Sequence, residues 1–383
     1  MDFNLTDIQQ DFLKLAHDFG EKKLAPTITE RDHKGIYDKD LIDELLSLGI
    51  TGAYFEEKYG GSGDDGGDVL SYILAVEELA KYDAGVAITL SATVSLCANP
   101  IWQFGTEAQK EKFLVPLVEG TKLGAFGLTE PNAGTDASGQ QTVAVKNDDG
   151  TYTLNGSKIF ITNGGAADIY IVFAMTDKSK GTKGISAFIV EKDFPGFSIG
   201  KKEKKMGIRG SATCELIFEN CIVPAENLLG QEGKGFGIAM KTLDGGRIGI
   251  ASQALGIAQG AMDETVRYLK ERKQFGRPLA KFQNMQFQLA DMQTRIEASR
   301  LLVRKAAFKK DRKQNYSADA AMAKLFAAET AMEMTTKAVQ YHGGYGYTRE
   351  YPVERMMRDA KITEIYEGTS EVQRMVIAGK LLK

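Results

Sequence analysis

The stretch TYTLNGSKIFIT at residues 151–162 is rich in β-branched and aromatic residues, which predicts a β-strand. Three runs of the same kind follow it: DIYIVFAM at 168–175, GISAFIV at 184–190 and CELIFENCIV at 214–223. Turn-forming clusters separate the runs: NDDG at 147–150, NGG at 163–165 and FPG at 194–196. Residues 121–228 are therefore predicted to form a middle β domain, either a barrel or a sandwich.

The sequence on either side of this domain has helical periodicity. Before it, apolar residues recur every three or four positions, and the same spacing returns at 41–46 and 69–79. The first such series is Leu5, Ile8, Phe12, Leu15 and Phe19. The segment KYGGSGDDGGD at 58–68 interrupts this pattern and predicts a surface loop. We therefore expect an N-terminal α-helical domain over residues 1–120.

After the β domain, four long helical segments are predicted, and their short connections favour a four-helix bundle over residues 229–383. The segments lie near 236–272, 281–311, 317–342 and 369–382. Gly245, Gly246 and Gly249 each weaken the first helix by roughly 1 kcal/mol relative to alanine. Close contact with a ligand or with backbone is the expected reason for them. The fold class is thus α+β and multidomain, in the order α, β, α.

Composition excludes several functions. The chain has 48 basic and 51 acidic residues, so nothing indicates binding to nucleic acid. Cys97, Cys214 and Cys221 show no Cys-x-x-Cys spacing, and the three histidines are far apart, so no metal site is predicted. The acidic N-terminus is unlike a targeting peptide, and we expect no run of about twenty apolar residues that could span a membrane. A cytoplasmic location is the simplest expectation.

Four segments carry groups suited to chemistry, and each also has an ordinary structural interpretation. Residues 126–136 place backbone N–H groups and two threonine hydroxyls at a turn, or simply connect two strands. Phe160 and Thr162 share one face of a strand and could cover a flat heterocycle, or belong to the core. Arg272 could hold a pyrophosphate or only favour a helix C-terminus.

The fourth segment is Ile365-Tyr366-Glu367-Gly368-Thr369-Ser370-Glu371. Thr369 or Ser370 can cap the last helix, with Glu371 in its first turn. Glu367 has no such structural task, because it precedes the cap and stands beside a glycine that permits a tight turn. It could be a functional base, or a structural or merely solvated carboxylate.

Taken together, these segments resemble the acyl-CoA dehydrogenase family over essentially the whole chain. The motifs are GLTEPNAGTD at 127–136, FITNGG at 160–165, RKQFGRP at 272–278, QYHGGYGY at 340–347 and IYEGTSE at 365–371. The segment LDGGRIGIASQALGIAQ at 243–259 resembles the short-chain, butyryl-CoA type in particular.

The resemblance implies one FAD per subunit, lying between the middle and C-terminal domains and completed by a neighbouring subunit, with a homotetramer as the expected assembly. The flavin would be bordered by Phe126, Leu128, Thr129, Gly134, Thr135, Phe160 and Thr162. The phosphate and adenine end would meet Arg272, Gln274, Phe275, Gln283, Gln340, Gly343 and Gly344 across a subunit interface. Thr369 and Glu371 would close over the cofactor.

For the thioester substrate, the resemblance points to Thr135, Asp244, Arg247, Tyr366 and Gly368. It implies that Glu367 removes the α-proton while the β-hydride passes to flavin N5, with an electron-transferring flavoprotein as redox partner. Burial beside an acyl chain should raise the pKa of Glu367. Some related enzymes carry the base just before the arginine that matches Arg247, but here that position is Gly246.

Two departures from the family pattern concern the cofactor. Phe160 stands where several relatives have tryptophan, and Glu371 replaces a common glutamine, which makes the adenine-side contact of Glu371 the weaker expectation. Two other functions remain open at this point: a flavoprotein of this fold that is not a dehydrogenase, and an acyl-CoA oxidase. The acyl chain length and the physiological direction of the reaction are not set by these motifs.

Overall fold

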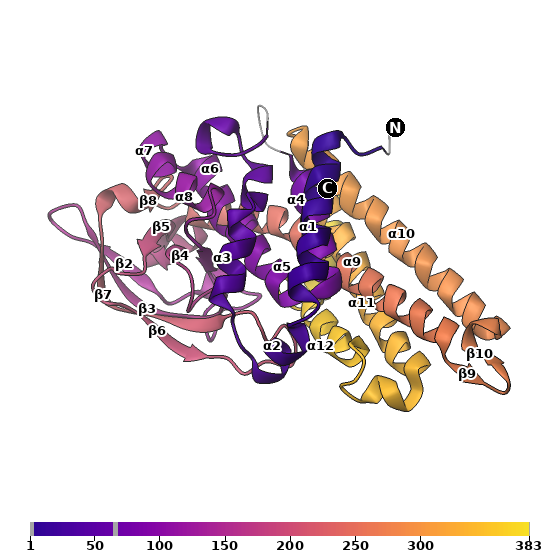
Figure 1. Cartoon of the computed structure of the whole chain (residues 1–383). Helices are drawn as coiled ribbons and strands as arrows, with labels where there is room; N and C mark the ends of the chain where they lie inside the picture. The colour runs from indigo at the N-terminus through magenta and orange to yellow at the C-terminus, as the bar shows by residue number, and fades with distance from the viewer. Residues whose placement is uncertain (1–3, 64–67, 383) are drawn as a thin grey trace.

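A computed structural model describes residues 4–63 and 68–382, and it places three blocks of secondary structure side by side (Figure 1). Helices of the first block occupy the middle of the view, the sheet lies on one side of them, and long helices extend to the other side. The α, β, α order expected from the periodicity is confirmed. Part of the expected loop at 58–68, namely 64–67, lies outside the described residues.

The N-terminal block begins with a capped amphipathic helix. Thr6 and Gln9 form a capping box at the start of α1 (Asp7–Phe19), which satisfies backbone N–H groups that a helix start leaves free. The expected apolar stripe is only partly buried, because Ile8 is 55% exposed. The other helices are α2 (Ile28–Lys34), α3 (Lys39–Ser47), α4 (Val69–Tyr82), α5 (Ala84–Ser91), α6 (Asn99–Phe104), α7 (Glu107–Gln109) and α8 (Val115–Val118).

An apolar helical run in this block corrects one expectation. Residues 84–104 continue from α5 through a π-helical segment (Ala92–Ala98) into α6, and they are long and apolar enough to cross a membrane. The sequence therefore does contain a run of the kind that we did not expect. Its most apolar window is completely buried inside the protein, as in the core helix of a folded domain.

The middle block is one mixed sheet whose strands follow the order β6-β7-β3-β2-β4-β5-β8, with β1 parallel to β4. Its central strand β4 has two buried faces. Ile171 and Phe173 face the core shared with the helices, whereas Tyr170 and Val172 face a second core inside the sheet. Burial on both faces explains why this strand is a continuous apolar run. The strands are β1 (Gly124–Gly127), β2 (Val143–Lys146), β3 (Tyr152–Thr162), β4 (Ile169–Met175), β5 (Ile185–Glu191), β6 (Phe197–Lys202), β7 (Thr213–Val223) and β8 (Leu228–Leu229).

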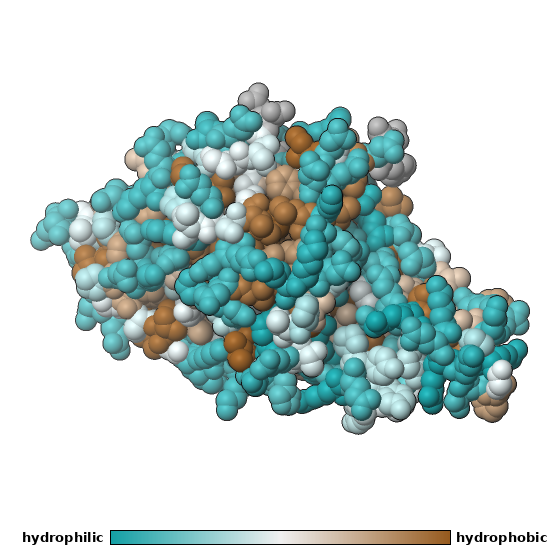
Figure 2. All heavy atoms as spheres, viewed as in Figure 1, coloured by the Kyte–Doolittle hydropathy of each residue, from teal (hydrophilic) through white to brown (hydrophobic). Residues whose placement is uncertain are grey.

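The C-terminal block contains the four expected helices, α9 (Gly235–Glu271), α10 (Gln283–Asp311), α11 (Ser317–His342) and α13 (Ser370–Leu381). A further helix, α12 (Val353–Thr363), was not expected. The antiparallel pair β9 (Lys273–Gln274) and β10 (Arg277–Pro278) follows α9 and lies at the tip of the bundle, far from the sheet (Figure 1). Figure 2 shows a mainly hydrophilic face interrupted by small hydrophobic patches.

Candidate active site

The turn between α12 and α13 holds Glu367 in an uncommon backbone conformation. Its φ is +53°, in the left-handed region that residues with a side chain seldom adopt, and Gly368 follows with φ +98°. Such a conformation persists only when its surroundings enforce it. Two side chains do so, because Lys324 Nζ and Gln373 Nε2 each donate a 2.8 Å hydrogen bond to the Gly368 carbonyl. Thr369 then caps α13 by accepting from the backbone N–H of Val372, as expected.

The glycines of α9 make room for this turn. A Cβ atom on Gly246 would overlap Glu367 Oε2 and would lie 2.8 Å from Leu96 Cδ2. Similarly, a Cβ on Gly249 would lie 2.5 Å from both the Ser91 and the Tyr72 hydroxyl oxygens. The close contact expected at these glycines is thus present, but it is made by side chains rather than by backbone. Because Gly246 has no side chain, the carboxylate next to this point of α9 is that of Glu367, from the turn packed against the helix.

Burial and neighbouring charges have opposite effects on the pKa of Glu367. Its Oε2 atom is buried and has no hydrogen-bond partner within residues 4–63 and 68–382. Burial raises the pKa of this carboxyl to about 7, although the cations of Lys324 and Arg247 act in the opposite direction. The expected raised pKa is therefore confirmed. A carboxylate with this pKa is poised to take up a proton near neutral pH.

Arg247 is itself buried and tied to a neighbour on α9. Its Nη1 atom lies 2.5 Å from Asp244 Oδ1, and its buried Nε has no partner in the described part of the chain. Burial raises the pKa of Asp244, while Arg247 opposes this shift. The Tyr366 hydroxyl donates to Gln253 Oε1, and Gln253 in turn donates to the Ala84 carbonyl at 2.7 Å. Four expected substrate residues, Asp244, Arg247, Tyr366 and Gly368, thus lie around Glu367.

The two segments of the middle block that are expected to border the flavin contact each other. The Ile159 N–H donates to the Thr129 carbonyl at 2.9 Å, which joins the GLTEPNAGTD turn to the FITNGG strand end. Beneath this junction the buried Lys158 Nζ donates to the Leu128 carbonyl and lies 2.7 Å from Glu130 Oε1. Burial lowers the pKa of Lys158 to about 8, and Glu130 opposes that shift. This ion pair fixes the turn from below.

The side chain of Phe160 is an exposed aromatic ring at this junction. Phe160 has φ +59° and is 61% exposed, whereas Ile161 beside it is buried. Thr162 is half-buried on the same side as Phe160. Phe126 is also half-buried and packs edge-on against Phe173 with 5.0 Å between ring centroids. An exposed ring held by fixed backbone, with hydroxyl and backbone donors close by, fits the flat polar edge of a flavin. Gly134 and Thr135 are exposed on the adjoining turn, with no contact among the described residues that joins them to Glu367.

Most of the other expected cofactor residues lie at the far end of the bundle, whereas Thr369 and Glu371 lie at the start of α13. Phe275, on the β9–β10 hairpin, is 91% exposed, and the Arg272 guanidinium lies 5.7 Å from the Tyr345 ring. At a rise of about 1.5 Å per residue, α9 carries Arg272 roughly 40 Å from Gly246. A single chain therefore does not bring this set to Glu367. The remaining members of the set are also exposed: Gln274, Gln283, Gln340, Gly343 and Gly344. Glu371 is exposed at the start of α13, and Thr369 beside it is half-buried.

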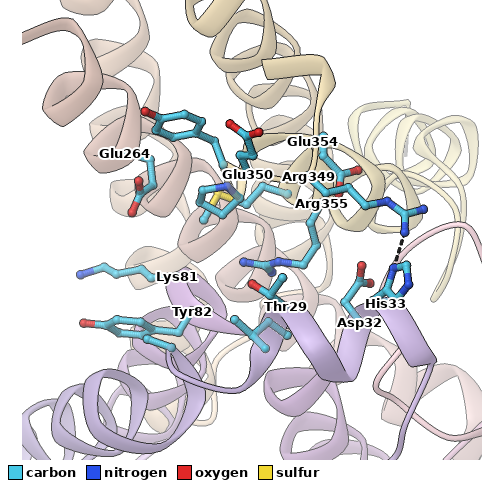
Figure 3. Close-up of a pocket in the computed structure, with 15 residues that line it drawn as sticks. Thr29, Asp32, His33, Lys81, Tyr82, Glu264, Arg349, Glu350, Glu354 and Arg355 are labelled. Atoms are coloured by element: carbon cyan, nitrogen blue, oxygen red, sulfur yellow. Dashed lines mark hydrogen bonds between the residues drawn. The ribbon is translucent and has the colours of Figure 1, made fainter. Parts of the chain in front are cut away.

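A separate hollow of about 530 Å³ lies where α2, α4, α9 and α12 meet (Figure 3). Both acidic and basic groups line it, and the Arg349 guanidinium donates to His33 Nδ1 across it. None of the expected site residues belongs to this lining. The hollow is therefore distinct from the site around Glu367.

Three models of acyl-CoA dehydrogenase domains match the chain: the N-terminal domain at residues 6–121, the middle domain at 125–221 and the C-terminal domain at 233–382. The chain belongs to the acyl-CoA dehydrogenase family. It is 79% identical to the short-chain specific acyl-CoA dehydrogenase of Megasphaera elsdenii over the full length of both proteins. The solved butyryl-CoA dehydrogenase of the same organism superposes with a TM-score of 0.99 at 78% identity, covering all of both chains.

Two further solved structures bear on the redox chemistry of this acyl-CoA dehydrogenase family. One, from a study of the electron transferring flavoprotein of Acidaminococcus fermentans, has a TM-score of 0.98 and 63% identity and covers both chains completely. The other, PigA with FAD and proline, has a TM-score of 0.94 and 32% identity, covering 100% of this chain and 99% of PigA. As a member of this family the chain is an oxidoreductase, and its exposed Phe160 ring with neighbouring donors suits the FAD that PigA binds.

Several residues of this site were not found by sequence reasoning. Lys324, Gln373 and Gln253 hold the turn and its neighbours; Lys324 and Gln373 belong to no quoted motif, and Gln253 lies within the 243–259 segment but was given no role there. Lys324 did leave a signal, since it is the only charged residue in AAMAKLFAA at 320–328 of a helix with several buried alanines. A lysine among buried alanines is unusual unless it is paired.

Proposed function

We propose that this chain catalyses the α,β-dehydrogenation of short-chain acyl-CoA, interconverting butyryl-CoA and crotonyl-CoA, with Glu367 as the catalytic base. The observation that carries the proposal is the buried Glu367 carboxylate beside Gly246, whose Oε2 has no hydrogen-bond partner among the described residues. An α-hydrogen of a thioester is weakly acidic, so its removal needs a base at close range and a donor to the developing enolate oxygen.

The Glu367 turn can supply both groups. The carboxylate accepts the α-proton, and burial that raises its pKa makes it a stronger base than an exposed glutamate. The backbone N–H of Glu367 donates to no acceptor in the described residues, so it is free to bind the thioester carbonyl. Bound FAD would accept the hydride that leaves the β-carbon. Arg247 and Lys324 stabilise the charged form of the base before the proton moves.

The preference for a short acyl chain is supported by hydroxyl groups close to the base. Tyr72 and Ser91 share a 2.7 Å hydrogen bond and cover Gly249, one helical turn along α9 from Gly246. Tyr72 also interacts electrostatically with Glu367. Both hydroxyls are buried, so a long alkyl chain entering here would have to displace them and break their hydrogen bond, which costs free energy. A chain of about four carbons avoids that cost.

We also propose the wider organisation of the enzyme. Exposed apolar side chains on the C-terminal block, among them Phe275, Tyr347, Met375 and Leu382, support a homotetramer in which a neighbouring subunit completes each cofactor site. The redox partner would be an electron-transferring flavoprotein and the location cytoplasmic. The domain boundaries 1–120, 121–228 and 229–383 and the cofactor and substrate contacts named above belong to the same proposal.

Anaerobic titration with butyryl-CoA tests the proposed function. The expected result is bleaching of the bound flavin absorbance, with longer saturated thioesters bleaching it progressively more slowly. An unchanged spectrum with every thioester would refute the dehydrogenase assignment. Rapid oxygen uptake during turnover without an added acceptor would instead indicate an oxidase.

A further inference from the structure

Lys324 is a cation buried against the catalytic turn. It lies on α11 and is 0% exposed, among alanines that are also buried. Its ammonium donates to the Gly368 carbonyl, which is one residue beyond Glu367. Burial of a charged ammonium is costly unless charges and hydrogen bonds compensate for it. A methionine or leucine would fill the same space without that cost, so the charge itself requires an explanation.

The groups around Lys324 indicate what its charge does. Three carboxylates, those of Glu367, Glu364 and Glu371, act on it electrostatically, and Arg247 is the opposing cation. Glu367 is the largest of these electrostatic influences, and Lys324 is in turn the largest cationic influence on Glu367. Arg247, Tyr72 and Tyr366 also interact electrostatically with Glu367 in the described part of the chain. Lys324 therefore acts on Glu367 in two ways: directly by its charge, and indirectly by its hydrogen bond to the Gly368 carbonyl of the same turn.

We propose that Lys324 is a positioning residue for the proposed reaction: it holds the Glu367–Gly368 turn through the Gly368 carbonyl and keeps the Glu367 carboxylate ionised through its charge. This inference rests on the proposed function, because it assigns a task toward the proposed base. Burial lowers the pKa of Lys324 to about 8, so the ammonium is present near neutral pH, where it is needed.

Gln373 offers a matched control for the two parts of this role. Its Nε2 donates to the same Gly368 carbonyl at the same 2.8 Å, but it carries no charge. Gln373→Met removes a hydrogen bond from the turn and leaves the charge of Lys324 in place. Lys324→Gln removes the charge but keeps an N–H donor, on a side chain one bond shorter than that of lysine, and Lys324→Met removes both the charge and the donor.

The test is the pH profile of flavin reduction by butyryl-CoA, measured anaerobically in the FAD-loaded enzyme and its variants. Lys324→Gln should move the midpoint of the acidic limb upward by about one pH unit, which makes reduction about tenfold slower on that limb. Gln373→Met should lower the rate at every pH without moving the midpoint. Lys324→Met should do both, and Lys324→Arg should restore the midpoint of the unmodified enzyme.

Two outcomes would overturn the proposal. If Lys324→Gln keeps the original midpoint, Lys324 is only a structural clamp; if Gln373→Met shifts the midpoint as far as Lys324→Gln does, charge is not the cause. Flavin content and thermal unfolding of each variant show which of them fold. If Lys324→Met does not fold, the pH midpoints of Lys324→Gln and Gln373→Met are sufficient to test the proposal. Failure of the unmodified enzyme to bleach would refute the proposed function instead.

Discussion

The Glu367 turn and the β9–β10 tip are two parts of one expected site, and they are built in opposite ways. Around Glu367, residues of α9, α11 and α13 of a single chain contact the turn, and the groups are mostly buried. At the tip, Arg272, Gln274 and Phe275 are exposed and meet little of their own chain. This difference supports our proposal that proton transfer is organised within one chain and that a second chain helps to retain the cofactor.

The largest effect should come from removing the base. Glu367→Gln keeps the shape of the side chain but cannot accept the α-proton, so flavin reduction by butyryl-CoA should slow by about 10²- to 10⁴-fold. Stopped-flow absorbance measures this rate, and the visible spectrum should show that FAD is still bound. Near-normal reduction in this variant would show that Glu367 is not the base.

A single methyl group added to α9 should disturb the Glu367 turn. Gly246→Ala places a Cβ where Glu367 Oε2 lies, so the base must shift, and we expect reduction to slow by about 10- to 100-fold. Gly237→Ala, in the same helix, is the matched control, because its Cβ would meet nothing within 4 Å. If both substitutions have the same effect, the tight seat of Glu367 has no functional importance.

Removal of the buried carboxylate should stabilise the fold at alkaline pH. The folded pKa of Glu367, about 7, lies above its ordinary value of 4.5, so the folded state binds more protons and loses stability as the pH rises between these values. Glu367→Gln should therefore raise the free energy of unfolding by about 1–3 kcal/mol at pH 8 and by little at pH 4. Urea unfolding of the apoprotein at the two pH values measures this difference; an equal gain at both would contradict the assigned pKa.

The smallest effect should come from the tip. Phe275→Ala removes an exposed ring, so unfolding of the monomer should change by no more than about 0.5 kcal/mol. If a neighbouring subunit brings its cofactor to this ring, FAD affinity should fall about tenfold, and flavin loss should increase on dilution. Unchanged affinity at every protein concentration would show that the tip takes no part in the shared site.

The architecture could be predicted where one physical signal was strong. β4 and the long helices have continuous apolar runs or sustained helical spacing, and both follow from their burial. The strands β2, β6 and β8 were missed because they are short and only partly buried. Helix α12 was missed because Pro352 and the preceding glycine-rich turn obscure its start, although its apolar face is buried in the bundle.

The site was predictable only in part. Glu367 and its raised pKa could be anticipated, because a carboxylate beside Gly368 has no capping role and the surrounding motifs imply a buried position. The contacts made by Lys324 and Gln373 could not, since both depend on α11 and α13 packing against a turn that is distant in sequence from Lys324. Tertiary packing, rather than any local pattern, gives these side chains their role.

The buried apolar run at residues 84–104 has a consequence for synthesis of the chain. Helix α9 covers part of this run, but it begins about 130 residues later. At typical rates of translation, roughly 7 to 26 s pass between the two segments. During that interval this apolar stretch lacks its final cover, and α4, which precedes it in the chain, is the packing surface available to it first.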